Sequence, residues 1–334
     1  MKSANIVLTG KQQVELKTEE VPPIPDGGIL VKTGVSLIST GTETICYRSE
    51  MDGGSHWEGW VKYPFYLGYS NVGTIVELGT GTEGYDIGDR VFSTGNHRQY
   101  AVVRGGAVKI PDDVSDESAA WSKLAMISQT GVRRAELKMG GRVVIIGAGP
   151  LGQLITQYCR VMGASEVMVI DTIDSRLEVA FAHGATQTFV GSAADALPFV
   201  ESHTDGERAD VVFDATGHFA VLPMGLRLAR QFGTLMLIGD SPYTSKQVLT
   251  GDVLTRQVSI RGTHNEKLAP HVEGWSGTRI VQLFHTYLKR GQMRVEDLIT
   301  SRHAPSEAPD VYANLLVNRA ETIGVVFDWK KISE

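Results

Sequence analysis

The stretch RVVIIGAGPLGQLITQYCRVMGASEVMVID, from Arg142 to Asp171, decides the fold. It opens with a short β-branched apolar run, which is typical of a strand buried on both faces of a parallel sheet. Three glycines follow in the spacing GxGxxG. Gly147 permits a tight turn, Gly149 lets the backbone approach a pyrophosphate, and Gly152 lets the next helix pack closely on the strand.

The rest of this stretch completes a dinucleotide-binding unit. Pro150 suits the first turn of a helix, and Leu151 begins an apolar series at helical spacing. A second apolar strand ends in Asp171, 24 residues after Gly147. A carboxylate there accepts both ribose hydroxyls of an adenosine and repels a 2′-phosphate. The sequence therefore predicts that these residues bind NAD rather than NADP; the alternative is a glycine turn in an ordinary α/β unit.

Size and charge limit the classes of function. The 334 residues suffice for two domains, and the net charge of −6 is modest. Basic runs interleaved with aromatic residues are lacking, so we expect a small-molecule substrate and neither nucleic acid nor membrane as partner. The chain has neither a long apolar span nor a signal-peptide pattern at its start, which favours the cytoplasm. Cys46 and Cys159 have no metal-ligand spacing and are interpreted as buried thiols in a reducing compartment.

The predicted secondary structure before the glycine turn differs from that after it. Short strand-like runs separated by glycine pairs predict a β-rich domain over the first hundred or so residues. A long helix is expected to follow, with Asp116 as its N-cap and Leu137 near its end. The expected strands of the first part are residues 6–8, 14–16, 29–33, 73–78, 90–93 and 100–103.

After Asp171 the pattern alternates between helices and buried strands, which predicts a doubly wound parallel sheet. Ligands bind beyond the carboxyl ends of such strands, so Thr216, Gly217 and Gly239 are candidates for lining the cofactor site. The last strand-like run, residues 323–329, is expected to return to the N-terminal domain. The other expected strands are residues 187–190, 209–213, 233–239 and 258–264, with helices at 177–183, 221–229 and from 277, and a helix with a surface loop at 192–208.

Four motifs resemble those of the medium-chain dehydrogenase/reductase family. They are GDRV at 88–91, GAGPLG at 147–152, RLEVAFAHGAT at 176–186 and DATG at 214–217. The resemblance implies a Rossmann domain, residues 122–265, inserted in a β-rich GroES-like catalytic domain of residues 1–121 and 266–334, with the active site in the cleft between them. It also places Arg176 among the cofactor-binding residues, and we expect a homodimer.

The zinc-binding positions of this family are replaced. Where zinc-dependent members carry a cysteine, a histidine with a glutamate, and a further ligand, this chain has Ser39 or Thr40, then Tyr69 and Ser70, then Ser122. Neutral hydroxyls are poor substitutes for thiolate, imidazole and carboxylate, so no bound metal is expected. The chain is similar here to a narrower branch, the hydroxyethyl-bacteriochlorophyllide dehydrogenase-like proteins, without any implication for the substrate.

Another group must then handle the proton that an alcohol loses on oxidation, a step that zinc usually eases. The resemblance places seven candidates for this role around the vacated metal position: Ser39, Thr40, Glu43, Tyr69, Ser70, His97 and Lys123. Five of them, all but Thr40 and Ser70, are predicted to be catalytic. Lys123 precedes a largely apolar helical stretch, where loss of water would favour its neutral form and its charge could replace that of zinc. The alternative is a surface lysine paired with Asp116 or Glu117.

The other candidates have alternatives too. The Tyr69 phenol could donate to a carbonyl oxygen, or it could be a packed tyrosine that replaces a histidine. His97 could relay a proton, or it could be a solvated histidine in a turn. Glu43 could orient a base or cap the helix after ISTGT. The aromatic insert, residues 51–66, is interpreted as an apolar lid or sugar-stacking wall, or as a dimer contact.

Three functions remain open. The first is a zinc-independent, NAD-dependent oxidoreductase that interconverts a secondary alcohol and a ketone on a small substrate, for which a polyhydroxylated molecule is one candidate. The second is a redox-neutral enzyme, in which tightly held NAD permits epimerisation or elimination through a transient ketone. The third is a non-catalytic protein that binds NAD.

Overall fold

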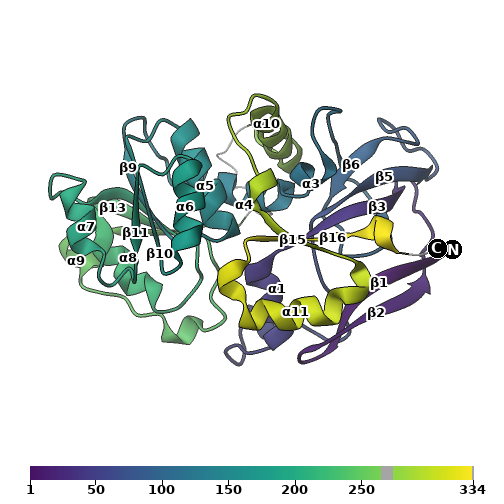
Figure 1. The fold of residues 1–334 in the computed structure, drawn as a ribbon, viewed down its shortest axis with the longest axis horizontal. Coiled ribbons are helices and arrows are strands. Elements are labelled where there is room, and N and C mark those ends of the chain that lie inside the picture. The colour runs from purple at the N-terminus through teal and green to yellow at the C-terminus, as the bar shows by residue number, and fades with distance from the viewer. Residues whose placement is uncertain (265–273, 333–334) are drawn as a thin grey trace. The chain divides into compact units, whose positions relative to one another are not determined.

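A computed structural model describes residues 1–264 and 274–332 and divides into two compact units (Figure 1). Unit 1 comprises Met1–Lys123 and Ser276–Glu334, and unit 2 comprises Leu124–Trp275. The first division falls two residues after the predicted boundary at 121/122, inside the helix α4, Ser122–Arg134. The second predicted boundary, at 265/266, lies outside the described residues. No helix in the described ranges is long and apolar enough to cross a membrane.

Unit 2 is a single sheet of six parallel strands in the order β11-β10-β9-β12-β13-β14. Numbered from β9, this order is 3-2-1-4-5-6, the arrangement of dinucleotide-binding folds. The predicted α/β class with a Rossmann sheet is thereby confirmed. The strands are β9 Arg142–Ile146, β10 Glu166–Asp171, β11 Gln187–Val190, β12 Ala209–Asp214, β13 Ala229–Leu237 and β14 Ser259–Gly262.

Helices cover this sheet because alternate residues of each strand face opposite sides. On one side, Val144 and Ile146 of β9 form a core with Leu226 of α8, Val221–Leu228. The helices α5, Pro150–Val161, and α6, Asp174–Ala182, pack against each other and against β9 and β10 (Figure 1). Burying one such aliphatic side chain contributes about 1.5–3 kcal/mol. Unit 2 also contains α7 Leu197–Ser202, η1 Thr244–Lys246 and α9 Asp252–Thr255.

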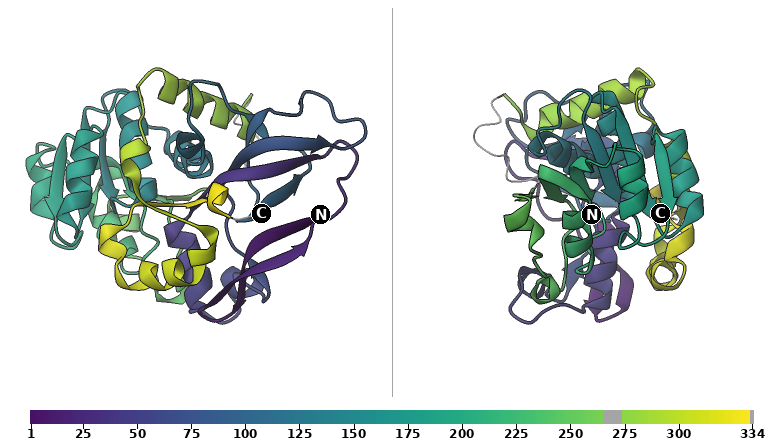
Figure 2. Two further views of the ribbon diagram at one scale, coloured as in Figure 1. Left: turned by 45° about the vertical axis from the view of Figure 1, so that its right-hand side comes forward. Right: turned by 90° about the vertical axis from the view of Figure 1, so that its left-hand side faces the viewer.

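Unit 1 contains two sheets (Figure 2). The larger runs in the order β15-β16-β3-β5-β6-β8, with β7 also paired to β3, and the smaller in the order β2-β1-β4. As predicted, the last strand pairs with the N-terminal part: Phe327 of β16 lies opposite Ser36 of β3. The strands are β1 Lys2–Gly10, β2 Gln13–Glu20, β3 Ile29–Ile38, β4 Phe65–Tyr66, β5 Asn71–Leu78, β6 Arg90–Ser93, β7 Tyr100–Val103, β8 Val108–Lys109, β15 Ile299–His303 and β16 Gly324–Asp328.

The core of unit 1 joins both ends of the chain. Ile6 and Leu8 of β1 are buried in one cluster with Tyr312 and Phe327 from the C-terminal segment. The helices of this unit are α1 Thr40–Arg48, α2 His56–Trp60, α3 Asp116–Ala119, α10 Gly277–Lys289 and α11 Ala308–Val317, with short 3-10 turns η2 Glu296–Leu298, η3 Pro305–Glu307, η4 Arg319–Glu321 and η5 Trp329–Lys331.

The single helix predicted from Asp116 to Leu137 is wrong. The structure has two helices, α3 and α4, interrupted at Ala120 and Trp121. The Trp121 ring is fully buried, and the Ala120 carbonyl accepts a hydrogen bond from Ser70 Oγ, so tertiary contacts break the helical run. The predicted N-cap is also corrected: Ser115 Oγ accepts from the Ser118 backbone at 3.1 Å, while Asp116 is the first helical residue.

The aromatic insert is not a continuous loop. Trp57, on α2, is only 3% exposed and belongs to the unit 1 core, and β4 pairs with β1. A lid or wall role is therefore wrong for Trp57, because its side chain is used within the unit 1 core, and it stays a prediction for the half-buried Phe65 and Tyr66. Trp60 and Tyr63 remain exposed, at 48% and 40%.

Candidate active site

The glycine turn after β9 has the geometry that a dinucleotide needs. Gly147 has φ +97°, in the region that favours glycine, and a Cβ on Gly152 would lie 1.8 Å from the Gly147 carbonyl oxygen. A Cβ on Gly149 would meet only Arg176 Nη1, at 4.0 Å, so this position is open on its remaining sides. Pro150 and Leu151 form the first turn of α5. An open Gly149 at a helix N-terminus fits a bound pyrophosphate.

Asp171, at the end of β10, is tied to this turn. Its Oδ2 accepts from the Ala148 backbone N–H at 2.6 Å, and its Oδ1 accepts from Ile173 N–H at 3.0 Å. A carboxylate offers about four lone-pair sites, so further acceptor capacity remains for ribose hydroxyls. Asp171 is half-buried, and Arg176 is buried on the following helix α6. Asp171 was predicted to bind the ribose hydroxyls of the cofactor. Its hydrogen bond to the glycine turn was not predicted.

The predicted residues after β12 and β13 lie close together. Asp214 Oδ1 accepts from the backbone N–H of Thr216 at 2.9 Å, from its hydroxyl at 2.6 Å, and from Gly217 N–H at 3.3 Å. A Cβ on Gly239 would lie 2.2 Å from Gly217 N, so only glycine lets these two turns meet. Burial raises the pKa of Asp214 even though these hydrogen bonds oppose the shift. The carboxylate therefore shapes the edge of the sheet where cofactors bind.

In unit 1, the Tyr69 hydroxyl lies between two hydroxyls of the α1 start. It donates to Ser39 Oγ in a very short hydrogen bond, and it lies 3.0 Å from Thr42 Oγ1. Burial of the phenol raises the pKa of Tyr69 well above its usual range, although the residue partly reaches the surface and the bonds to Ser39 and Thr42 lower it. At neutral pH Tyr69 is therefore a protonated donor within a chain of hydroxyls.

Glu43 and His97 form a buried pair beside these hydroxyls. His97 Nε2 lies 3.1 Å from Glu43 Oε2, and Glu43 Oε1 accepts from the Ser39 backbone N–H at 2.8 Å. The contact with the Ser39 N–H agrees with the predicted role of Glu43 at the start of α1, and the role of orienting a base stays a prediction. The reading of His97 as a solvated turn residue is wrong, because the residue is 1% exposed.

Lys123 completes the cluster. Its side chain is buried, with the residue 4% exposed, and its Nζ lies 5.8 Å from the centroid of the Tyr69 ring. The alternative of a surface lysine is wrong. The acids proposed as its partners are engaged elsewhere: Asp116 pairs with Arg90 at 2.7 Å, and Glu117 with Arg302 at 2.6 Å. The structure thus brings together all five predicted catalytic residues, and adds Thr42, which the ISTGTE motif contained.

The other residues that align with zinc ligands make hydrogen bonds inside the protein. Ser70 Oγ donates to the Ala120 carbonyl, and Ser122 Oγ lies 3.0 Å from His285 Nε2. The Thr40 carbonyl accepts from Thr44 Oγ1 at 2.6 Å. Within residues 1–264 and 274–332, no three His, Cys, Asp or Glu side chains gather in a group that could hold a metal ion. The donor set at these positions does not fit zinc, which prefers thiolate, imidazole and carboxylate ligands.

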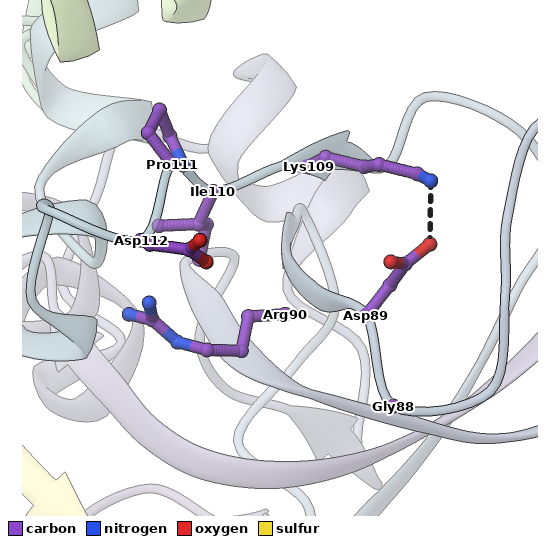
Figure 3. A pocket seen from close by; sticks show the side chains of 7 residues that line it. All are labelled: Gly88, Asp89, Arg90, Lys109, Ile110, Pro111 and Asp112. Atoms are coloured by element: carbon purple, nitrogen blue, oxygen red, sulfur yellow. Dashed lines mark ion pairs between the residues drawn. The ribbon is translucent and has the colours of Figure 1, made fainter.

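Two hollows in the described residues contain none of the predicted site residues. One, of about 320 Å³, lies between the Gly88 turn and residues 109–112, where Lys109 and Asp89 point toward each other in an ion pair of 2.7 Å (Figure 3). The other, of about 750 Å³, lies at the amino ends of β9, β10 and β12, around Arg142, Glu166 and Asp210. Cofactors bind at the opposite ends of such strands, so the second hollow is not the expected cofactor site.

Comparison with known proteins identifies the family. The model of the alcohol dehydrogenase GroES-like domain matches residues 32–112, and that of the zinc-binding dehydrogenases matches residues 150–273. The chain therefore belongs to the medium-chain dehydrogenase/reductase family, as its motifs predicted. The second match begins after all the positions at which zinc ligands were sought, so its name does not bear on metal binding in this chain. The narrower branch stays a prediction.

Two relatives act on sugars or polyols by name. A D-guloside 3-dehydrogenase from Shigella flexneri is 26% identical over 319 residues, which cover 86% of this chain and 89% of the relative. A sorbitol dehydrogenase from Bombyx mori is 27% identical over 301 residues, 77% of this chain and 82% of the relative.

Two solved structures that share this fold contain a nicotinamide cofactor, NADP in one and NADH in the other. A dehydrogenase from Sinorhizobium meliloti bound to NADP superposes with a TM-score of 0.82 at 22% identity, covering 98% of this chain and 99% of its own. An alcohol dehydrogenase from Escherichia coli complexed with NADH gives 0.81 at 22% identity, with the same coverage. These likenesses establish the fold alone.

Proposed function

We propose that this protein is a nicotinamide-dependent oxidoreductase that interconverts a secondary alcohol and a ketone on a small, polyhydroxylated molecule. The observation that carries this proposal is the cluster in which Tyr69, Ser39 and Lys123 bring hydroxyls and an ammonium together in a dehydrogenase fold. Relatives whose names specify a guloside and sorbitol support a sugar or polyol as substrate.

The proposed cofactor is NAD. When bound, the nicotinamide accepts a hydride from an alcohol carbon or returns it to a ketone. The preference for NAD over NADP rests on Asp171, whose carboxylate is half-buried beside the glycine turn and would repel a 2′-phosphate. Gly149 leaves space for the pyrophosphate, and the close approach of Gly239 to Gly217 shapes the neighbouring turns.

The proposed chemistry uses no metal. Lys123 supplies positive charge that stabilises the alkoxide-like oxygen developing on the substrate as hydride leaves. The alcohol proton passes to the Tyr69 oxygen as Tyr69 passes its own proton to Thr42 Oγ1, and Thr42, which partly reaches the surface, releases its hydroxyl proton to solvent water. The phenol therefore never carries a full negative charge. In the reverse direction the same phenol donates a proton to the ketone oxygen. The raised pKa of Tyr69 favours such a concerted transfer over a free tyrosinate.

Substitution of Lys123 tests this function. In Lys123→Met, turnover of NAD with a responsive polyol should fall on the order of 10²- to 10³-fold, because a charge at the developing oxyanion is lost, while NAD affinity stays within about twofold. The measurement is initial-rate NADH formation across a panel of alcohols, cyclitols and sugars, with NAD affinity from calorimetry. Lys109→Met is the matched control, since that lysine pairs with Asp89.

Three outcomes of this experiment are informative. Tyr69→Phe should lose less activity than Lys123→Met and show a shifted pH profile. Near-normal turnover of the Lys123 variant would exclude its proposed role. Product that accumulates without net NADH would instead indicate a redox-neutral reaction.

Metal independence has its own measurement. Dialysis against a strong chelator should leave turnover unchanged, and elemental analysis should find far less than one zinc per chain, because Ser39, Tyr69, Ser70 and Ser122 offer no suitable ligand set. A zinc content close to one per chain, removable with loss of activity, would refute the proposal. The homodimer stays a prediction.

A further inference from the structure

Glu43 is a nearly fully buried carboxylate that accepts three hydrogen bonds. Besides the Ser39 N–H at 2.8 Å and His97 Nε2 at 3.1 Å, the Tyr312 hydroxyl donates to Glu43 Oε2 at 2.5 Å. Glu43 is 2% exposed, so each of these bonds replaces water that the charged group has lost. Hydrogen bonds to a charged group are the strong ones, and losing one leaves a buried acceptor short of a donor.

The other ring nitrogen of His97, Nδ1, also has a hydrogen-bond partner. His97 Nδ1 lies 2.7 Å from Ser36 Oγ, and the Trp329 indole N–H donates to the same oxygen at 2.8 Å. An indole nitrogen can only donate, so the Ser36 hydroxyl hydrogen can turn to His97 Nδ1. His97 Nε2 then carries its hydrogen toward Glu43. These hydrogen bonds assign the Nε2–H tautomer to His97. Each polar side-chain group in the network that links Trp329, Ser36, His97, Glu43 and Tyr312 then has a hydrogen-bond partner.

The network connects the C-terminal segment to the start of α1. Tyr312 lies on α11 and Trp329 begins η5, whereas Ser39 directly precedes α1 and carries the hydroxyl to which Tyr69 donates. Ser39 has no capping bond from its own side chain, but its backbone N–H donates to the Glu43 carboxylate and its carbonyl accepts from the Glu43 N–H at 2.9 Å, so Glu43 holds it from both sides.

We propose that Tyr312 and Trp329 are positioning residues for the reaction: through Glu43 and His97 they fix Ser39, and thereby the Tyr69 hydroxyl, for proton transfer. This inference rests on the proposed function. The titratable groups that face Glu43 are His97, Tyr312, Tyr69 and Cys46, with Lys123 lying over the Tyr69 ring. None of these groups is provided by a solvent-exposed side chain.

Tyr312→Phe removes one hydroxyl and keeps the ring that packs beside Tyr47 and Phe327. We expect kcat to fall about 10- to 100-fold, the loss that a hydrogen bond to a charged group implies, with KM for NAD unchanged. Loss of this donor disturbs the buried contacts of Glu43 and His97, so the acid limb of the kcat profile should shift as well. Tyr47→Phe is the matched control, because its hydroxyl makes no bond to Glu43, and it should retain both kcat and the profile.

If Tyr312→Phe folds poorly, a second variant and an NMR measurement on His97 still test the inference. Trp329→Phe removes the donor at the other end of the network and should lower kcat in the same direction. In ¹⁵N NMR of histidine-labelled protein without cofactor, the His97 resonance, assigned by its absence in His97→Gln, should report the Nε2–H tautomer and change in both variants.

Unchanged kcat, pH profile and His97 resonance in folded Tyr312→Phe and Trp329→Phe would overturn the inference. An acid limb that stays in place while thermal stability falls would also overturn it, because a merely structural role has that signature. If the wild-type protein oxidises no alcohol or sugar, the proposed function fails instead, and the NMR result still decides whether the network holds His97 as described.

Discussion

At the scale of single residues, Asp171 shows how one carboxylate combines two tasks. It was predicted as the group that selects NAD, and the structure places it on the backbone N–H groups of Ala148 and Ile173. The carboxylate that is predicted to select NAD therefore also shapes the glycine turn. Replacing it should alter both cofactor preference and overall cofactor affinity.

Substitution can separate the two tasks of Asp171. Asp171→Ser should lower the ratio of NAD to NADP affinity at least about tenfold, because the like-charge repulsion of the 2′-phosphate is removed. Affinity for NAD should fall as well, since both backbone bonds are disturbed. Asp171→Asn is the control: it keeps an acceptor oxygen but removes the charge, so preference should change more than turn stability. Calorimetric titration with both cofactors measures this, and a wild-type protein that prefers NADP would contradict the assignment.

The five residues predicted to be catalytic do lie together. Most of them could be predicted because they belong to short sequence motifs that align with the family's metal-binding motifs. The ISTGTE and GYS stretches supply Ser39, Glu43 and Tyr69, and the first turn of α4 supplies Lys123. Tyr312 and Trp329 could not be predicted, since each is a lone aromatic residue far along the chain whose partner is set only by tertiary packing. Burial of Lys123 was also undecided, because sequence does not show that Arg90 and Arg302 take Asp116 and Glu117.

At the scale of elements, periodicity predicted the long strands and helices of unit 2 within a few residues. Strands β6, β7 and β11 match their predicted bounds, because turn residues border each of them. The two-residue strand β4 and the break between α3 and α4 were missed. Both depend on contacts with distant elements, β1 in one case and Ser70 in the other, and neither leaves a local pattern.

The helix α10 provides a prediction about acid stability. Its His285 is buried, and His285 Nε2 lies 3.0 Å from Ser122 Oγ at the start of α4. Burial lowers the pKa of His285 from 6.5 to about 4. The unfolded chain therefore binds a proton below pH 6.5 that the folded protein accepts only near pH 4, so stability is lost as the pH falls through this window. Between pH 7 and pH 5 the loss should be about 2 kcal/mol.

Urea unfolding of the wild-type protein and His285→Gln at pH 7, 6 and 5 measures this contribution. Carboxylates titrate in both proteins, so the variant serves as the baseline. The wild-type free energy of unfolding should fall more steeply with acid than that of His285→Gln. Parallel curves would show that the imidazole does not titrate as described.

At the scale of the whole molecule, the two units were not equally accessible to prediction. Unit 2 is one continuous segment whose motif, alternation and strand order all indicate the same fold. Unit 1 combines segments from both ends of the chain, and its short strands pair over long separations, so the sequence indicated a β-rich domain but not its sheet order. Only the return of the last strand was expected, and it is found beside β3.

The pairing of β16 with β3 has a consequence for synthesis on the ribosome. The strand β5 occupies one edge of β3, so β7 and β16 share the other: β7 covers residues 29–32 and β16 covers residues 35–38. Residues 39–323 separate the second half of that edge from its partner, β16. At about 5–20 residues per second, nascent chains carry this open strand edge for tens of seconds, and unit 2 is completed at Trp275, before β16 begins at Gly324. Exposed strand edges pair with other chains, so a nascent chain is open to aggregation at this edge until β16 has been made.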